Sequence, residues 1–164
     1  MVLQRTLVLV KPDGVQRGLM GEIIKRFEQR GLKIVGLKLV HIDSDFARRH
    51  YTEDISIRKG EKVRTNLLGF ITSGPVTAIV LEGVDAIANV RKIVGDTESK
   101  SALPGTIRGD FSHVSYSHAD EKNDAIRNIV HASSNETDAK NEISLWFSGS
   151  EIYSYKRSDD EHLI

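Results

Sequence analysis

Short apolar runs and segments with helical spacing alternate along the first part of the chain. Residues 6–10 are apolar and β-rich, which is typical of a buried strand. Residues 20–29 carry apolar side chains at helical spacing, and Gly31 follows as a stop signal. Residues 32–42 return to alternating apolar positions and predict a second strand. The chain therefore begins as strand, helix, strand.

The rest of the chain repeats the strand–helix–strand unit, and a pair of helices is predicted between the two units. The predicted elements are a short helix at 43–50, a helix at 63–71, a strand at 76–81, a helix at 84–94, a long loop at 95–110, a strand at 128–132 and a helix at 137–147. Residues 52–61 form a polar stretch between the paired helices. Residues 126–130 suit a helix nearly as well as a strand. The tail at 148–164 is expected to wrap the surface.

The order of these elements predicts the fold class. A repeated split unit, β-α-β-β-α-β, is the ferredoxin-like arrangement, an α+β fold with an antiparallel sheet and helices on its faces. The chain has 164 residues, and a chain near this size buries enough surface for a core without disulfides. We therefore expect one domain over residues 1–164, with an insertion around 111–124.

The amino-acid composition excludes several classes of function. The chain has no cysteine, which excludes disulfides, thiolate zinc sites and thiol catalysis. Lysine plus arginine equals aspartate plus glutamate at 23 each, and zero net charge disfavours nucleic acid as a partner. No apolar run approaches the ~20 residues of a membrane span. We therefore expect no membrane association and a cytoplasmic location.

One sharp corner presents a cation. The strand at 6–10 delivers Lys11 to the sequence Pro12-Asp13-Gly14. Proline fixes one backbone dihedral, and glycine permits a turn that most residues resist. A lysine on a stiff support suits an anion such as a phosphate.

His131 stands out among the six histidines through its neighbours. Asn128 precedes it, Ser133 follows, and Glu142 lies in the next predicted helix. A carboxylate beside an imidazole can hold it in one tautomer. A neutral imidazole is a good nucleophile toward phosphorus, because an ordinary histidine pKa of about 6.5 leaves a free lone pair near neutral pH. For a lone histidine, the alternative is a satisfied, partly buried core residue.

Three cations extend the hypothesis of a phosphate site. Lys11, Arg91 and Arg108 each lie at an element edge or in a glycine-rich loop. Phosphoryl transfer needs charge-assisted donors around the phosphate chain together with Mg²⁺. One charge pair near a protein surface gains only ~4 kcal/mol before desolvation. One cation would not hold a polyphosphate against water, whereas three with Mg²⁺ could.

Several motifs in sequence order resemble one family. They are Lys-Pro-Asp-Gly-Val-Gln-Arg-Gly at 11–18, His50-Tyr51, Ser-Gly-Pro at 73–75, Pro-Gly-Thr-Ile-Arg-Gly-Asp at 104–110 and Arg-Asn-Ile-Val-His-Ala-Ser at 127–133. From about residue 5 to 147 the chain resembles nucleoside diphosphate kinases. This resemblance implies a ferredoxin-like domain in a homo-oligomer, usually a hexamer. It also implies transfer of a γ-phosphoryl group from a nucleoside triphosphate to a nucleoside diphosphate through a phosphohistidine, with ping-pong kinetics.

The resemblance also implies residue roles. His131 would be the nucleophile, with Ser133 and Glu142 as its support and Tyr51 shaping its surroundings. The residues that would contact phosphates or sugar hydroxyls are Lys11, Arg91, Thr97, Arg108 and Asn128. Mg²⁺ would be the cofactor, and we expect no set of metal-ligating side chains in the protein itself.

The chain departs from the family pattern at the base-binding helix. The family has a phenylalanine that stacks on the base, whereas this chain has Val63 there, with Leu67 nearby. Base stacking on aromatic residues is worth ~1–3 kcal/mol in single-strand binders, so Val63 and Leu67 predict a weaker apolar platform. Because no base-reading donor is apparent near Val63, we expect broad base choice.

The segment at 111–124 is longer than the family pattern. It holds His113, His118 and Asp120, which invites interpretation as a metal site. One loop with two spaced histidines is weak support for that interpretation. We expect a surface hairpin.

Two alternatives remain open at the level of sequence. Ferredoxin-like sheets also serve as nucleotide- or RNA-binding modules without catalysis, usually with aromatic residues on the strands; the strands at 6–10 and 76–81 hold none. A small-molecule regulatory domain could use the same fold. Phosphoryl chemistry on His131 separates both from the enzyme.

Overall fold

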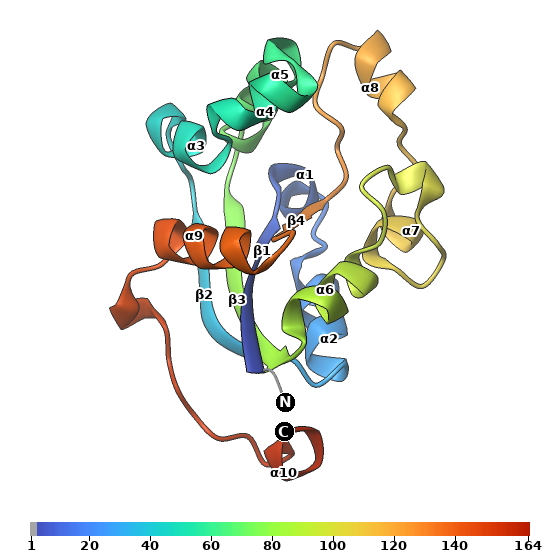
Figure 1. Ribbon diagram of the computed structural model, residues 1–164. Helices are drawn as coiled ribbons and strands as arrows, with labels where there is room; N and C mark the ends of the chain where they lie inside the picture. Colours follow the sequence, from blue (N-terminus) through green and yellow to red (C-terminus); the bar gives the residue numbers. More distant parts are fainter. Residues whose placement is uncertain (1–2) are drawn as a thin grey trace.

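A four-stranded sheet forms the centre of the protein in the computed structural model, which describes residues 3–164 (Figure 1). Its strands are β1 (Leu3–Val10), β2 (Lys33–Val40), β3 (Val76–Val84) and β4 (Val130–Ala132). They lie in the order β2-β3-β1-β4, and each neighbouring pair is antiparallel. The predicted ferredoxin-like α+β fold is confirmed.

Helices connect the strands and cover the sheet. Their bounds are α1 (Pro12–Gln16), α2 (Met20–Gln29), α3 (Ser44–His50), α4 (Glu53–Lys59), α5 (Glu61–Ile71), α6 (Ala86–Val94), α7 (Ile107–Phe111), α8 (Tyr116–Glu121), α9 (Glu136–Trp146) and α10 (Asp160–Leu163), with 3₁₀ turns at Ser99–Ser101 and Gly149–Glu151. Two sequence signals act as predicted: the Asp43 carboxylate accepts from the Phe46 N–H at 2.8 Å at the start of α3, and Gly31 adopts a φ of +85° after α2.

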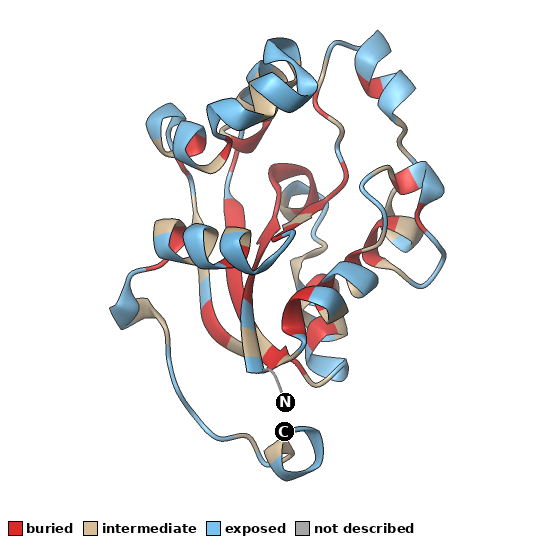
Figure 2. Ribbon diagram, in the orientation of Figure 1, coloured by how far each residue is buried: buried red, intermediate tan, exposed pale blue. Residues whose placement is uncertain are grey.

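The two central strands are buried on both faces (Figure 2). Successive residues of a strand point to opposite faces, so Val8 packs in a cluster with α2 and α6, whereas Leu9 packs in a second cluster with Trp146 of α9. Helices therefore cover both faces of the two central strands. Within residues 3–164, these strands offer no open face of the kind that an RNA-binding module uses.

Two segments contain helix that the pattern did not predict. The polar stretch at 52–61 holds α4, which has acidic residues in its first turn and basic residues in its last. These charges complement the helix dipole, and Gly60, with a φ of +98°, separates α4 from α5. The loop at 95–110 contains the turn Ser99–Ser101 and the start of α7, which the Thr106 hydroxyl caps at 3.0 Å from the Gly109 N–H.

The corner after β1 is a short helix, α1, and not the tight turn that the sequence predicts. Pro12 occupies its first position, where a missing N–H costs nothing. Gly14 does not adopt a positive φ. It is needed for close approach, since a Cβ there would lie 2.7 Å from Val10 Cγ1 and 2.9 Å from Ile129 Cγ2.

The insertion at 111–124 contains helix α8, so the expectation of a hairpin is wrong. The Ser115 hydroxyl caps α8 by accepting from the His118 N–H at 3.2 Å. Asn123, with a φ of +52°, reverses the chain after the helix. The capping serine was the local signal for this helix.

The tail runs along the free edge of β2, in agreement with the expectation that it wraps the surface. The Tyr153 N–H donates to the Val35 carbonyl at 2.8 Å, and the Tyr155 hydroxyl donates to the Ile34 carbonyl at 2.6 Å. Lys33 pairs with Asp160 at 2.9 Å. Across the described residues, none of the helices combines the length and apolar character needed to cross a bilayer.

Gly14→Ala tests the close approach between α1 and the segment before β4. The added methyl would meet the Ile129 carbonyl at 3.2 Å as well as two side chains, so we expect the free energy of unfolding to fall by about 1–3 kcal/mol in urea denaturation. Gly21→Ala is the matched control, because nothing lies within 4 Å of that position; there, alanine should raise helix stability by up to ~1 kcal/mol. Equal unfolding midpoints for the two variants would contradict the argument.

Candidate active site

A cavity of about 720 Å³ opens above the ends of β1 and β4. Helices α4 and α5 form one wall, and the segment after α6 together with α8 forms the other (Figure 1). Ten of the eleven residues singled out from the sequence line it: Lys11, Tyr51, Val63, Leu67, Arg91, Thr97, Arg108, Asn128, His131 and Glu142. Ser133 is fully buried beside Glu142. The structure therefore brings the whole predicted set together.

His131 lies in the middle of β4, paired with Leu9 of β1. Its Nε2 atom lies 3.0 Å from both carboxylate oxygens of Glu142, which projects from α9. A carboxylate only accepts hydrogen bonds, so Nε2 carries the proton and Nδ1 keeps its lone pair. The His131 side chain is 21% exposed, and a reactant in the cavity can reach it.

Glu142 is itself held in place. The Ser133 hydroxyl donates to its Oε2 at 2.6 Å, and the Leu7 N–H donates to that hydroxyl at 3.3 Å. Burial alone would raise the pKa of the Glu142 carboxyl, but His131 and Ser133 outweigh burial and hold that pKa below its ordinary value. The group therefore remains a carboxylate that fixes the imidazole.

A second histidine, His50, lies against the first. The two ring centroids are 4.8 Å apart with the planes at 84°, and the Trp146 indole N–H donates to His50 Nδ1 at 3.1 Å. Burial, and then the neighbouring His131, lower the pKa of His50 to about 3. His50 therefore stays neutral. Sequence reasoning assigned it no role, because nothing local indicates that Trp146 packs against it.

His50, His131 and Glu142 also form the one group in the described chain with three potential metal-ligand atoms within 4.8 Å of one another. Two of these side chains already bond to each other, and His50 Nδ1 accepts from Trp146. We interpret the group as a hydrogen-bonded imidazole support. The residues of the insertion, His113, His118 and Asp120, do not form a comparable group among residues 3–164.

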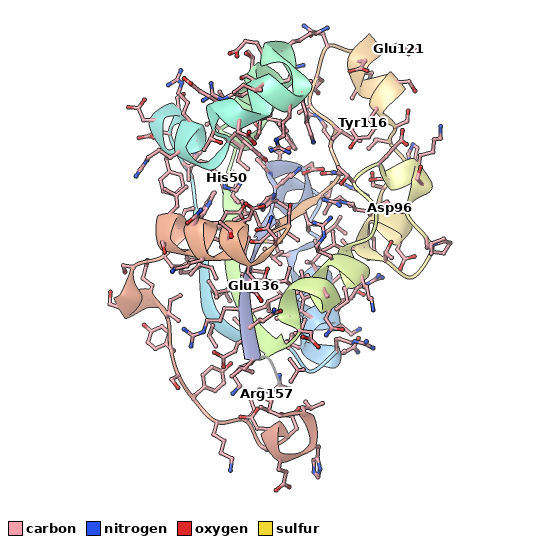
Figure 3. All side chains as sticks on the ribbon, viewed as in Figure 1. His50, Asp96, Tyr116, Glu121, Glu136 and Arg157 are labelled. Atoms are coloured by element: carbon pink, nitrogen blue, oxygen red, sulfur yellow. The ribbon has the colours of Figure 1, made fainter. Side chains whose placement is uncertain are left out.

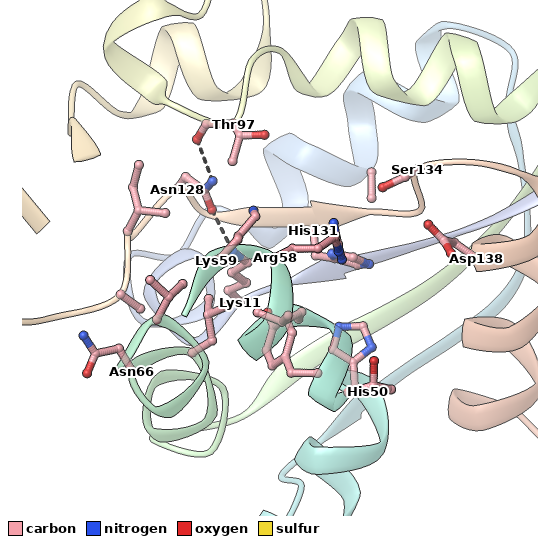
Figure 4. Close-up of a pocket in the computed structure, with 18 of the residues that line it drawn as sticks. Lys11, His50, Arg58, Lys59, Asn66, Thr97, Asn128, His131, Ser134 and Asp138 are labelled. Atoms are coloured by element: carbon pink, nitrogen blue, oxygen red, sulfur yellow. Dashed lines mark hydrogen bonds between the residues drawn. The ribbon is translucent and has the colours of Figure 1, made fainter. Parts of the chain in front are cut away.

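Lys11 is buried at the start of α1, with 5% of its surface exposed. Its Nζ donates to Asn128 Oδ1 at 2.7 Å, and the Asn128 amide donates to the Thr97 carbonyl at 2.7 Å (Figure 4). Burial, and then the charge of Arg108, lower the pKa of Lys11 from 10.5 to about 7. A lysine in this state gains from any anion that enters the cavity.

Arg108 joins three parts of the backbone. Its guanidinium donates to the carbonyls of Gly95 at 3.0 Å, Asn128 at 3.2 Å and Val130 at 2.6 Å. Burial, and then Arg91, lower its pKa to about 10. Its remaining N–H groups and its charge face a cavity that it helps to shape.

Positive charge at this end of the cavity is not neutralised by the protein. Arg91 is exposed and makes no side-chain hydrogen bond or ion pair within residues 3–164. The nearby Asp13 is buried, and its Oδ2 accepts from the Ile129 N–H at 3.0 Å. The cations Lys11, Arg91 and Arg108 therefore repel one another until an anion binds.

Strained backbone precedes the histidine strand. Ile129 has a φ of +75°, which is an outlier for a β-branched residue. The Ile129 N–H donates to the Asp13 carboxylate, and the Ile129 carbonyl accepts from the Lys11 N–H at 2.8 Å. This conformation fixes the start of β4. No sequence pattern indicates a positive φ at an isoleucine.

The mouth of the cavity is apolar on both sides. Val63 and Leu67 line it from α5, and Ala119 lines it from α8. Asn66 and Asp120 contribute polar atoms there. Sequence reasoning assigned no site role to Asn66, Ala119 or Asp120, because they lie outside the motifs and their proximity depends on the path of the insertion.

Tyr51 lines the cavity between its two ends. Burial raises the pKa of its phenol, so the hydroxyl stays protonated. Together the site offers a nucleophilic nitrogen, a buried cationic end and an apolar mouth. These are the parts needed to hold a nucleotide by its phosphates and to transfer a phosphoryl group.

Comparisons with known proteins agree with this chemistry. The family model described as nucleoside diphosphate kinase matches residues 4–152. A nucleoside diphosphate kinase of Borreliella burgdorferi is 51% identical over 99% of this chain and 98% of its own length, and one of Haloquadratum walsbyi is 48% identical over 99% and 95%.

Solved structures give the same result. A transition-state mimic of the Borrelia burgdorferi nucleoside-diphosphate kinase with bound vanadate and ADP has a TM-score of 0.97 at 49% identity, covering 99% of this chain and 98% of that one. A Halobacterium salinarum nucleoside diphosphate kinase in complex with CDP has a TM-score of 0.83 at 40% identity, covering 97% of each chain. The protein is thus a phosphotransferase acting between nucleoside triphosphates and diphosphates, and the chain belongs to the nucleoside diphosphate kinase family.

Proposed function

We propose that His131 Nδ1 is the atom that carries the phosphoryl group in a ping-pong reaction. Its lone pair attacks the γ-phosphorus of a nucleoside triphosphate, and the bond from that phosphorus to the β,γ-bridging oxygen breaks, releasing the diphosphate. A second diphosphate then takes the group through a terminal β-phosphate oxygen. The observation that carries this proposal is the contact of Glu142 with Nε2, which leaves Nδ1 unprotonated.

The cationic end of the cavity would bind the phosphate chain. Lys11, Arg91 and Arg108 supply charge, and charge-assisted donors of this kind are strongest where water is excluded. Thr97 and Asn128 also line the cavity and would contact phosphate oxygens or ribose hydroxyls, whereas Tyr51 would shape the surroundings of His131. Asn128 and Lys11 already bond to each other, so they would act as one preorganised unit.

Val63 and Leu67 would form the platform for the base. Both lie on α5 at the cavity mouth, one helical turn apart. Their aliphatic faces offer contact area without the stacking of an aromatic ring, so affinity for the base would be modest.

Mg²⁺ is the divalent cation we propose for this enzyme. The side chains proposed to bind the phosphates are donors and cations, and the Asp13 carboxylate is buried and bonded to the Ile129 N–H. This donor set fits a Mg²⁺ ion held by substrate phosphate oxygens and water, a common arrangement for this ion. When bound, it would neutralise charge on the phosphates. The protein's own task is to position those phosphates against His131.

We also propose that residues 1–164 act as one kinase domain within a homo-oligomer, a hexamer by family resemblance. The edge of β2 supports assembly, since Leu37 and Leu39 are 51% and 57% exposed there. Exposed apolar side chains on a strand edge favour pairing with another chain. The cytoplasmic location stays a prediction.

The phosphohistidine itself can be detected. Incubation with γ-labelled ATP and Mg²⁺ should give an acid-labile, alkali-stable phosphoprotein, and a diphosphate chase should remove the label. His131→Asn should abolish labelling and lower transfer by at least ~10³-fold. His162→Asn, in the exposed tail, is the control. Label retained in His131→Asn would refute the assignment.

Glu142→Gln should slow transfer by about 10–100-fold, the usual effect of removing a group that orients a reactive imidazole. The amide keeps the shape of the side chain but not the charge that fixes the Nε2 proton. Glu136→Gln, in the exposed first turn of the same helix, should leave the rate unchanged. An unaltered rate for Glu142→Gln from pH 6 to 9 would count against the proposed orientation.

Lys11→Met should change how stability depends on pH. The folded-state pKa of Lys11 lies near 7 and its unfolded value near 10.5, so between these values the unfolded chain binds more protons and stability rises with pH. The variant loses this dependence. Relative to wild type, the unfolding free energy of the variant should be higher at pH 6.5 than at pH 9.5, by on the order of 3 kcal/mol.

The matched control is Lys25→Met, an exposed lysine on α2, which should leave the pH profile unchanged. The loss of the bond to Asn128 changes the stability of Lys11→Met by the same amount at every pH. The change of unfolding free energy with pH therefore reports the titration of Lys11 alone. Parallel profiles for Lys11→Met and wild type would contradict the burial argument.

A further inference from the structure

We propose that Asp120 on α8 makes this enzyme selective for the base, favouring guanine over thymine and uracil. The proposal revises the broad base choice expected from the sequence, and it rests on the placement of the nucleotide given above. The insertion that carries Asp120 would then be a specificity element rather than a surface loop.

The direction of a bound nucleotide follows from the charges. The cations Lys11, Arg91 and Arg108 lie at the His131 end of the cavity, where the phosphates must react. Ribose separates the phosphates from the base, so the base lies toward the mouth, between α5 and α8. Figure 4 shows Asn66 of α5 on the side of the cavity away from Ser134 and Asp138.

The mouth forms a slot with aliphatic walls. Val63 and Leu67 stand on one side, and Ala119 and Ala125 on the other, with both alanines buried. A base bound at the mouth would contact these four aliphatic side chains, none of which stacks as an aromatic ring would. Discrimination among bases must then come from polar groups at the edge of the slot.

The insertion is held firmly enough to present a fixed group. The Tyr116 N–H donates to Glu98 Oε1 at 3.0 Å, and the Lys100 N–H donates to the Val114 carbonyl at 3.0 Å. Ser115 caps α8. Helix α8 is thus tied to the loop that follows α6, which also carries Thr97.

Asp120 is the carboxylate of α8 that lines the cavity. This carboxylate makes no hydrogen bond or ion pair within residues 3–164. Asp124, which also lines the cavity, differs: its oxygens accept from the Ala125 N–H at 2.8 Å and from Arg127 Nε at 2.9 Å. Only Asp120 of this pair is free to bind a ligand.

Carboxylate chemistry then selects the base. A carboxylate offers two acceptors and no donor. Guanine presents two adjacent donors, N1–H and the N2 amino group, which match two carboxylate oxygens. Thymine and uracil present one N3–H between two carbonyl oxygens, which a carboxylate repels. Asn66, on the opposite wall, can donate or accept and does not discriminate in this way.

The test compares dGDP and dTDP as competing acceptors with ATP as donor. Hydrogen bonds to a charged group are the stronger kind, so wild type should favour dGDP by about tenfold in kcat/KM at this exposed edge. Asp120→Asn keeps the shape and should cut that preference about fivefold, by lowering kcat/KM for dGDP and raising it for dTDP. Glu121→Gln is the control, because Glu121 lies at the outer end of α8 and does not line the cavity (Figure 3).

A binding measurement separates this proposal from the catalytic one. Calorimetry with the His131→Asn variant should show tighter binding of dGDP than of dTDP, and adding Asp120→Asn should remove the difference. If wild type and Asp120→Asn both transfer phosphate normally and show the same ratio of kcat/KM for dGDP to that for dTDP, the role of Asp120 is overturned and the kinase assignment stays intact. Absence of a phosphohistidine in the wild-type enzyme, with base preference in calorimetry preserved, would overturn the catalytic proposal and support the role of Asp120.

Discussion

Buried positive charge at the end of β1 is the constraint on which this site depends. Lys11 and Arg108 are almost fully buried, and neither forms an ion pair within residues 3–164, an arrangement that costs stability unless an anion is present. The protein tolerates it because the surrounding sheet and helices over-determine the positions of both groups. Arg108 binds three carbonyls, and Lys11 binds Asn128. The same contacts that hold the charges also hold the strand that carries His131.

The imidazole is positioned by elements far apart in the chain. β4 supplies His131, α9 supplies Glu142, and the Leu7 backbone of β1 supports Ser133. His50 closes one side of the ring as a neutral neighbour, with its tautomer set by Trp146. Under the mechanism proposed above, Nδ1 would be the reactive atom, because Glu142 already bonds to Nε2. Orientation and charge together account for phosphoryl transfer by a family whose fold alone implies no chemistry.

Most of the fold could be predicted because its strands and main helices follow simple periodicity, as the segments 6–10 and 20–29 illustrate. The site residues could be predicted because they lie in motifs such as Lys11-Pro-Asp-Gly and the segment around His131. Helix α8 was missed because its one signal, Ser115, is local and weak. The role of Gly14 and the conformation of Ile129 were missed because both depend on contacts between α1 and a segment more than a hundred residues away.

The three carbonyl contacts of Arg108 complicate any genetic study of this residue. A substitution there would release the backbone at Gly95, Asn128 and Val130 at once, so slower turnover would report a displaced scaffold as much as a missing charge. Arg91 has no such contacts within residues 3–164, so it is the cleaner position at which kinetics can measure the effect of a guanidinium that we propose to bind phosphate. In this enzyme, mutation of Arg108, which lies in a conspicuous motif, is harder to interpret than mutation of Arg91.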